Sequence, residues 1–240
     1  MNFFSLFKRK ILYKLKKKIN IDLERIEIET LDKLFQHYKS DKSDKFHGFS
    51  NFYDQNLQHL RNKEIKILEV GSYAGASASA FVKHFTKSSV YCFDINISKF
   101  IYYSDKIFVY GLDINNNKKV EKIIKEIKNK NSQDGFDIII DDGSHYLSDI
   151  LSTFKKLFKH LKSKGFYIIE DFKYPNYYNY NNDVKDILVD QMLKHLSQKS
   201  FFNSKILSND DQIYLHKYID KINIYKGNLK NSDICFIQKK

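Results

Sequence analysis

The sequence lacks several residue types that would mark a common class of protein. Its 240 residues include one proline, two cysteines and no tryptophan. A single proline excludes proline-rich linkers, and two cysteines far apart, Cys92 and Cys235, provide neither a disulfide framework nor a zinc site. Because both lie in apolar runs, we interpret them as buried thiols in a reducing compartment. No apolar run approaches the roughly 18 residues that a membrane span needs.

Aromatic residues and lysine are, by contrast, abundant. The 20 phenylalanines and 17 tyrosines are too many to leave in water, which excludes intrinsic disorder for most of the chain. Lys and Arg outnumber Asp and Glu by 41 to 29, a formal net charge of +12. Residues 1–18 hold seven of these bases and no acid, which leaves 34 bases against 29 acids in the rest of the chain. More than half of the excess charge is therefore concentrated in one short arm.

The apolar residues of this arm fall on roughly one face of a helix. A basic amphipathic helix of this kind either rests on an anionic membrane surface or packs on its own domain or a partner subunit. We take residues 1–37 as a helical extension and residues 38–240 as the main domain. The reducing compartment that the two thiols indicate, and an N-terminus without the arrangement of a secretory signal, predict a cytoplasmic protein. The arm leaves open a peripheral contact of residues 1–18 with the inner membrane surface, and a homo-oligomer also stays possible.

Short apolar runs alternate with amphipathic segments along the rest of the chain. Two terminal strands, 219–227 and 233–240, are joined by a short turn, and residues 39–57 are predicted to be a polar loop. The pattern predicts a doubly wound, Rossmann-like α/β fold, with a seven-stranded sheet, the last strand antiparallel and helices on both faces. The other predicted strands are 65–70, 90–95, 106–114, 136–142 and 166–171, and the predicted helices are 22–38, 79–85, 118–130, 147–165 and 183–200.

Small and acidic residues follow these strands, where ligands bind in parallel sheets. Gly71 and Gly75 come directly after the first strand and would allow a tight turn and a close approach to a ligand. Their spacing is neither that of a dinucleotide site nor that of a P-loop. Asp94 ends the second strand, 23 residues after Gly71, where an acid can accept hydrogen bonds from ribose hydroxyls. Acids also end the next three strands, which a ligand with hydroxyls and positive charge, such as S-adenosyl-L-methionine, would explain.

Four motifs, ILEVGSYAGAS, VYCFDIN, IIIDDGSH and FYIIED, together resemble those of class I S-adenosylmethionine-dependent methyltransferases. More narrowly, DDGSH followed by IED resembles the sugar O-methyltransferase group that includes the macrocin and mycinamicin enzymes and cephalosporin hydroxylase-like sequences. The loop with Lys42, His47 and Tyr53 is similar to a signature that this group carries before the first strand. Phe49 stands where the group usually has Tyr, and GLDIN stands where a G-D-Q motif is common. The resemblance covers roughly residues 38–173 and the terminal strand pair.

The DDGSH motif also carries a chemical prediction of its own. Asp142 and His145 flank a Gly-Ser turn at a strand end, and Asp171 ends the next strand. Adjacent strands would bring the two carboxylates together, and such a pair suits a hard cation such as Mg²⁺. His145 could then act as general base toward an acceptor hydroxyl. The resemblance implies the same roles, and Glu170 is either a third metal ligand or a surface acid.

The remaining candidates each have a second interpretation. Asp141 contacts the cofactor or caps its loop, and Tyr73 covers the cofactor or packs. Glu69 contacts the cofactor, or it has the structural role of holding the glycine turn or Lys42. Lys42 and His47 bind cofactor or acceptor, or hold the N-terminal helix in place. The Asn/Tyr-rich stretch 174–183 is either an acceptor lid or a flexible insert. The predicted cofactor contacts are Lys42, Glu69, Gly71, Ser72, Tyr73, Gly75, Ser77, Asp94, Asp113 and Asp141, and the predicted acceptor contacts are His47, Tyr174 and Tyr177.

The sequence therefore favours Mg²⁺-assisted O-methylation of a sugar or glycan precursor, for a capsule or other surface polysaccharide or for a natural product. One alternative acceptor is a small phosphorylated metabolite, and another is RNA. Methylation of a nucleic-acid base usually needs a polar-Pro-Pro-aromatic element after the fourth strand, and methylation of a ribose usually needs a lysine. This chain has DDGSH after its fourth strand and no lysine in that strand, so a nucleic-acid acceptor is not favoured. A non-catalytic docking module is the third hypothesis, against which the intact motifs count. The Lys-, Asn- and Ile-rich composition indicates an AT-rich bacterial genome, which favours a surface glycan.

Overall fold

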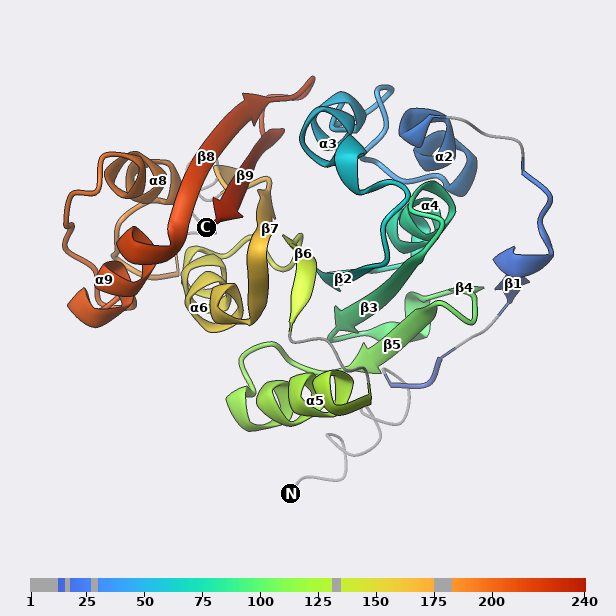
Figure 1. The fold of residues 1–240 in the computed structure, drawn as a ribbon, viewed down its shortest axis with the longest axis horizontal. Coiled ribbons are helices and arrows are strands. Elements are labelled where there is room, and N and C mark those ends of the chain that lie inside the picture. The colour runs from blue at the N-terminus through green and yellow to red at the C-terminus, as the bar shows by residue number, and fades with distance from the viewer. Residues whose placement is uncertain (1–12, 16–17, 27–29, 131–134, 175–182) are drawn as a thin grey trace. The chain divides into compact units, whose positions relative to one another are not determined.

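The structure is a computed structural model that describes residues 13–15, 18–26, 30–130, 135–174 and 183–240. The chain divides into two compact units, Met1–Ser132 and Gln133–Lys240. Three of the seven main strands lie in the first unit and four lie in the second (Figure 1).

The first unit is built on three parallel strands in the order β5, β3, β2. In Figure 1, helices α4 and α5 lie on opposite sides of these strands. The strands are β2 (Ile65–Val70), β3 (Ser88–Asp94) and β5 (Ile107–Gly111), and a separate parallel pair is β1 (Ile19–Asn20) with β4 (Tyr102–Tyr103). The helices are α2 (Leu31–Tyr38), α3 (Ser50–Leu57), α4 (Ala76–His84) and α5 (Asn117–Lys130), with 3-10 turns η1 (Ile21–Leu23), η2 (Gln58–Leu60) and η3 (Ile97–Lys99).

The core of the first unit follows from its sequence pattern. Every residue of β2 is buried, as expected for a parallel strand that is covered on both faces. An aromatic cluster joins the helices on one face, because the ring of Phe35 in α2 lies 6.1 Å from Tyr53 in α3 and 5.6 Å from Phe81 in α4. On the other face, α5 buries the apolar residues of its 3-4 pattern, which are Val120, Ile123, Ile124 and Ile127.

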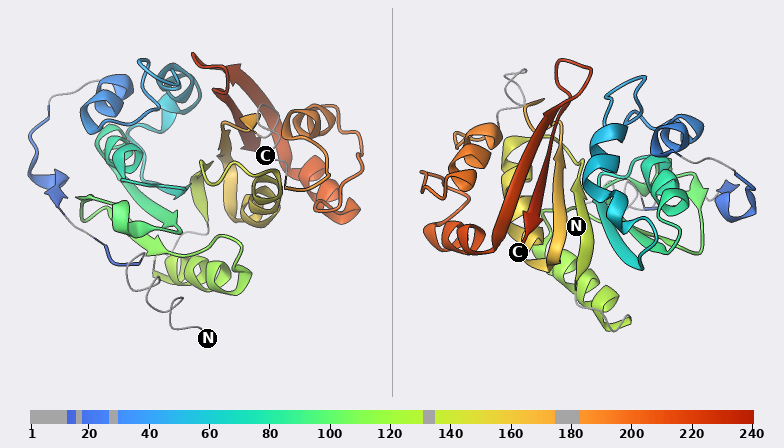
Figure 2. Two further views of the ribbon diagram at one scale, coloured as in Figure 1. Left: turned by 180° about the vertical axis from the view of Figure 1, so that it is seen from behind. Right: turned by 45° about the horizontal axis from the view of Figure 1, so that its top comes forward.

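The second unit has four strands in the order β6, β7, β9, β8. Strand β6 pairs with β7 in parallel, while β9 runs antiparallel to both β7 and β8. Figure 2 shows that the helices of this unit lie on one side of its strands. The elements are β6 (Phe136–Asp141), α6 (Leu147–Leu157), η4 (Phe158–His160), β7 (Leu161–Glu170), α8 (Val189–Ser197), α9 (Asn209–Tyr218), β8 (Ile219–Lys226) and β9 (Asp233–Lys239).

Aromatic packing and a helix cap hold the second unit together. The ring of Tyr167 in β7 is fully buried and lies 5.0 Å from Phe154 in α6. Ser208 caps α9 because its Oγ accepts a hydrogen bond from the N–H of Asp211 at 3.3 Å, and its own N–H donates to Asp211 Oδ2 at 2.8 Å. Lys155 of α6 lies 2.6 Å from the same carboxylate, so this cap also joins α6 to α9.

The predicted Rossmann-like fold with an antiparallel strand near its C-terminus is confirmed, and both cysteines are buried and free. Two segments of the first unit differ from the prediction. Residues 22–38 do not form one helix, because α2 begins only at Leu31, where Thr30 Oγ1 accepts a hydrogen bond from the N–H of Lys33 at 3.3 Å. Residues 39–57 are not all loop, since they include α3, whose start has no side-chain cap that would reveal it in the sequence.

The second unit differs at three helix boundaries. The helix predicted over 147–165 ends at Leu157, and after η4 the chain enters β7 at Leu161, which pairs with Phe136. Gly165 lies within β7 and does not stop a helix; a Cβ there would lie 2.8 Å from the carbonyl oxygen of Asp137. Within the predicted helix 183–200, only Val189–Ser197 is helical, and α9 was not predicted at all.

The predicted amphipathic helix over residues 1–18 lies mostly outside the described residues, and the described ones, 13–15 and 18, are not helical. Throughout the described ranges, no helix combines the length and the apolar character needed to cross a membrane.

Candidate active site

The glycine turn after β2 is built on left-handed backbone. Gly71 has a φ of 86° and Gly75 a φ of 82°, and a Cβ on Gly75 would lie 2.4 Å from the buried Phe100 ring. Tyr73 also has a positive φ, 41°, although it is not glycine, and its side chain is 67% exposed. Such backbone strain persists only where the surroundings enforce it, and it clusters at functional sites.

Asp94 at the end of β3 enforces that conformation. Its Oδ2 accepts a hydrogen bond from the N–H of Tyr73 at 2.8 Å, and its Oδ1 accepts one from the N–H of Asn96 at 2.6 Å. The predicted ribose acceptor therefore also shapes the glycine turn. Asp113, two residues beyond β5, accepts a hydrogen bond from the N–H of Asn115 at 2.9 Å, so it caps its own turn.

Buried polar residues next to the glycine turn stabilise it through hydrogen bonds. Glu69 is fully buried, and its Oε1 accepts a hydrogen bond from Ser77 Oγ of α4 at 2.5 Å. Ser72 Oγ donates to the carbonyl oxygen of Glu69 at 3.3 Å. Burial, together with the carboxylates of Glu69 and Asp94, raises the pKa of the Cys92 thiol. Glu69 thus links the end of β2 to Ser77 of α4.

The loop before α3 contributes two more predicted residues to the first unit. Lys42 is 1% exposed, and its carbonyl oxygen accepts a hydrogen bond from the N–H of Phe49 at 2.9 Å. His47 Nε2 lies 4.0 Å from the carboxylate of Asp41, and its ring lies 5.1 Å from that of Phe49. Both residues therefore belong to one ordered loop of the first unit.

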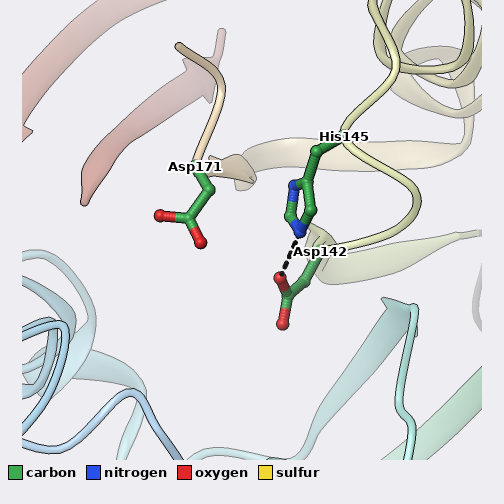
Figure 3. A group of neighbouring side chains, drawn as sticks. All are labelled: Asp142, His145 and Asp171. Atoms are coloured by element: carbon green, nitrogen blue, oxygen red, sulfur yellow. Dashed lines mark ion pairs between the residues drawn. The ribbon is translucent and has the colours of Figure 1, made fainter. Parts of the chain in front are cut away.

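Three predicted residues of the second unit come together in one cluster (Figure 3). Asp142 follows β6, Asp171 follows β7, and His145 lies in the turn before α6. Each offers one ligand atom, and these atoms all lie within 4.8 Å of one another. His145 Nε2 lies 3.6 Å from Asp142 Oδ1, while Asp171 faces the pair from the neighbouring strand.

The backbone at this cluster is strained in the same way as at Tyr73. His145 has a φ of 59° and Asp171 a φ of 49°, and neither residue is glycine. Asp171 is 8% exposed, whereas the side chains of Asp142 and His145 are 21% and 23% exposed. Asp142 and His145 are therefore the more solvent-accessible members of the cluster.

Two residues that sequence reasoning missed hold the DDGSH turn. Ser144 Oγ donates a hydrogen bond to the carboxylate of Asp149 in the first turn of α6, and it accepts one from the N–H of Tyr146 at 3.3 Å. A serine five residues before an acid at a helix start is the only sequence signal for this contact. Together the two residues fix the turn that carries His145.

Asp141 is the last residue of β6, directly before Asp142 of the cluster. It is 5% exposed, and the hydroxyl of Tyr167 donates to it at 3.4 Å. Burial and the adjacent charge of Asp142 raise its pKa to about 8, although the N–H of Gly143 donates to it and acts in the opposite direction. The contact with Gly143 corresponds to the loop-capping interpretation of Asp141.

Three other predicted residues have different outcomes. Glu170 is 2% exposed and is not among the clustered side chains; it is the last residue of β7 and pairs with Ile234. Tyr174 lies beside the cluster, with its ring 5.8 Å from that of His145. Tyr177 and most of the predicted acceptor lid lie outside the described residues.

Comparisons with known proteins agree with the motif resemblance. No protein-family model matches the sequence. The chain is 31% identical over 152 residues to L-olivosyl-oleandolide 3-O-methyltransferase of Streptomyces antibioticus, which covers 60% of this chain and 38% of that protein. It is 27% identical over 150 residues to mycinamicin VI 2''-O-methyltransferase of Micromonospora griseorubida, which covers 59% of this chain and 35% of the relative.

A third curated relative is demethylmacrocin O-methyltransferase of Streptomyces fradiae, 28% identical over 160 residues, or 59% of this chain and 36% of that protein. The match thus spans little more than a third of the length of these relatives. Among solved structures, the MycE methyltransferase from the mycinamycin biosynthetic pathway, in complex with Mg, SAH and mycinamycin VI, has a TM-score of 0.70 at 23% identity. The likeness covers 89% of this chain and 55% of that one, and it shows the fold. The predicted resemblance to the macrocin and mycinamicin group is confirmed.

Proposed function

We propose that this protein is an S-adenosylmethionine-dependent O-methyltransferase that acts on a hydroxyl of a sugar or glycan precursor. The observation that carries this proposal is the cluster of Asp142, His145 and Asp171, whose ligand atoms lie within 4.8 Å of one another. The curated relatives support the reaction class, because their names describe O-methyltransferases whose acceptors include L-olivosyl-oleandolide and mycinamicin VI.

The first unit would bind the methyl donor. The left-handed turn from Gly71 to Gly75 allows a ligand to approach the backbone closely, and Asp94 holds that turn in shape through the N–H of Tyr73. The carboxylate of Asp94 has further lone pairs that can accept hydrogen bonds from ribose hydroxyls. Lys42, Ser72 and Asp113 complete the proposed donor contacts of this unit.

The donor atoms of the second unit fit a divalent cation. Carboxylate oxygens are the ligands that Mg²⁺ prefers, and Asp142 and Asp171 offer two of them in one cluster. These two residues would hold the ion, and Glu170, which lies outside the cluster, would not. When bound, Mg²⁺ would orient the acceptor and lower the pKa of its hydroxyl.

His145 would take the proton of that hydroxyl. Its Nε2 lies 3.6 Å from Asp142 Oδ1, so the imidazolium that forms would be stabilised by a neighbouring carboxylate. The acceptor oxygen would then attack the donor's methyl carbon, forming the O–CH₃ bond as the S–CH₃ bond breaks. The sulfonium becomes a neutral thioether, which balances the charge. Tyr174, close to the His145 ring, would face the acceptor sugar.

The acceptor would be part of a capsule or other surface polysaccharide, because the composition indicates an AT-rich bacterial genome. The enzyme would then act in the cytoplasm, with the basic arm as a peripheral contact to the inner membrane surface.

A binding and turnover screen of the purified chain tests the proposal. We expect S-adenosylhomocysteine to bind, and labelled methyl groups to reach nucleotide sugars or oligosaccharides only when Mg²⁺ is present. Sugar phosphates and RNA would be included as competing acceptor classes. Transfer that persists at full rate in excess EDTA would contradict the metal's role, and labelling of RNA but of no sugar would contradict the acceptor class.

A further inference from the structure

The basic arm contacts the first unit at the end of strand β5. The ring of Tyr13 occupies the space that a side chain on Gly111 would fill, because a Cβ there would lie 2.8 Å from Tyr13 Cδ1 and 3.0 Å from Cγ. Lys119 of α5 contacts both Tyr13 and Gly111. Its Nζ lies 4.8 Å from the centre of the Tyr13 ring, and it donates a hydrogen bond to the carbonyl oxygen of Gly111 at 2.6 Å.

Gly111 lies next to Asp94 of the proposed donor site. It pairs with Asp94 across the parallel ladder, and the N–H of the next residue, Leu112, donates to the carbonyl oxygen of Asp94 at 2.9 Å. Asp94 in turn holds the glycine turn through Tyr73. Ile97, which follows Asp94 in the chain, reaches the same spot, because its Cδ1 would lie 3.3 Å from a Cβ on Gly111.

A second contact links the arm to the glycine turn itself. The N–H groups of Lys18 and Ile19 donate to the carbonyl oxygen of Ile101 at 2.9 and 3.1 Å. The N–H of Ile101 donates to the carbonyl oxygen of Ala74 at 3.1 Å, inside the turn. The neighbouring Phe100 ring fills the space above Gly75. The arm and the residue after it, Ile19, therefore reach two of the segments that carry proposed donor contacts, the glycine turn and the end of β3.

We propose that residues 13–15 and 18 of the arm, with residues 19–20 that follow it, form a strap that stabilises the donor site, with Tyr13 as a positioning residue for the nucleoside end of the donor. The inference rests on the proposed function, in which Asp94 receives the ribose. Tyr13 acts through Gly111, the last residue of β5, which pairs with Asp94. Because coupling between two binding events is reciprocal, donor binding and docking of the strap favour each other.

The glycine at position 111 makes this contact testable. Gly111 does not have a left-handed φ, so an alanine there meets no strain of that kind, and the three atoms nearest to its Cβ belong to the side chains of Tyr13 and Ile97. Gly111→Ala should therefore displace the strap in the intact chain. In a Tyr13→Ala background, the same change should have little further effect, and the non-additivity measures the contact.

The experiment measures binding of S-adenosylhomocysteine and of 5′-methylthioadenosine, which keeps the nucleoside but lacks the amino-acid half. Titration calorimetry would compare the full chain with Tyr13→Ala, Tyr13→Phe, Gly111→Ala and the double variant. We expect Tyr13→Ala and Gly111→Ala each to weaken both ligands about tenfold, as loss of one aromatic contact predicts. Tyr13→Phe should keep the affinity of the unchanged chain. Lys14→Ala is the matched control, because Lys14 is exposed in the same arm and its loss removes a charge without the ring.

The outcomes separate the two levels of the proposal. If the unchanged chain binds S-adenosylhomocysteine while Tyr13→Ala and Gly111→Ala bind it equally well, the strap has no role in donor binding and this inference is wrong. If these variants unfold at a lower temperature but bind S-adenosylhomocysteine with unchanged affinity, the conclusion is the same, because the contact then contributes to the stability of the fold and not to donor binding. If the unchanged chain binds neither ligand, the proposed function itself fails, and the inference fails with it.

Discussion

Acidic residues lie at strand ends in both units, but their side chains make different contacts in each unit. In the first unit, the carboxylate of Asp94 accepts hydrogen bonds from two backbone N–H groups and so fixes the shape of the loop around it. In the second unit, Asp142 and Asp171 come within 4.8 Å of each other and of His145. The same sequence signal, an acid after a buried strand, thus gives a scaffold in one unit and a group of potential metal ligands in the other.

The largest effect should come from His145→Ala. Loss of the proposed general base should slow methyl transfer by roughly 100-fold or more. Affinity for S-adenosylhomocysteine should stay unchanged, because the proposed donor contacts lie mainly in the first unit. Single-turnover rates with labelled donor, beside calorimetric titration, would measure both quantities. A variant that transfers methyl groups at the full rate would show that the second unit is as much a scaffold as the first.

The neighbours Asp171 and Glu170 give a matched pair. Asp171→Asn keeps the shape of the side chain and tolerates the left-handed backbone, but it removes one of the two proposed metal ligands. We expect its turnover to fall by about 100-fold at a Mg²⁺ concentration that saturates the unchanged enzyme, and to rise partly as more is added. Glu170→Gln should keep the original Mg²⁺ dependence. If Glu170→Gln changed the Mg²⁺ dependence of turnover and Asp171→Asn did not, the assignment of Asp171 as a metal ligand would be wrong.

Asp94→Asn tests the scaffold side of the comparison. Asparagine retains one carbonyl oxygen, so one of the two charge-assisted hydrogen bonds to Tyr73 and Asn96 is lost, at a cost of about 2 kcal/mol. Donor affinity should fall by roughly tenfold to 100-fold as the glycine turn loosens. The Mg²⁺ dependence of turnover at saturating donor should not change. If turnover fell with donor affinity intact, Asp94 would belong to the chemistry and the contrast between the units would disappear.

The smallest expected effect concerns the α9 cap, which belongs to the scaffold of the second unit. Burial alone would raise the pKa of Asp211, but hydrogen bonds from Lys155 and Ser208 outweigh it and hold this pKa below its ordinary value. The folded state therefore favours the ionised carboxylate, which contributes stability at neutral pH that is lost as the pH falls through the lowered pKa. Asp211→Asn should cost about 1 kcal/mol at pH 7 and less near pH 3.

Denaturant unfolding at the two pH values would measure that difference. Asp210→Asn is the control, because Asp210 is the neighbouring exposed acid of the same helix turn. A loss of stability that is equal at both pH values would show that the carboxylate charge does not contribute to the cap.

Local patterns predicted a large part of this molecule. Buried strands such as Ile65–Val70 are recognisable because every residue in a covered parallel strand needs to be apolar or internally satisfied. The α9 helix was missed although Ser208 and Asp211 carry a capping-box spacing, since its apolar residues do not gather on one face. Helix α6 was predicted too long, because Leu161 has the helical spacing but pairs with Phe136 in the sheet.

The sequence by itself determined the alternating fold, the glycine turn and the neighbourhood of Asp142 and His145, which are three residues apart in one strand-end turn. Only the tertiary structure decided that Asp171 and not Glu170 faces them, because the choice depends on where β7 ends and on a left-handed residue after it. Only it placed Tyr13 on Gly111, nearly a hundred residues away. Spacing along a chain fixes which residues share a turn or a face, whereas the partner across a sheet edge is fixed by packing between distant segments.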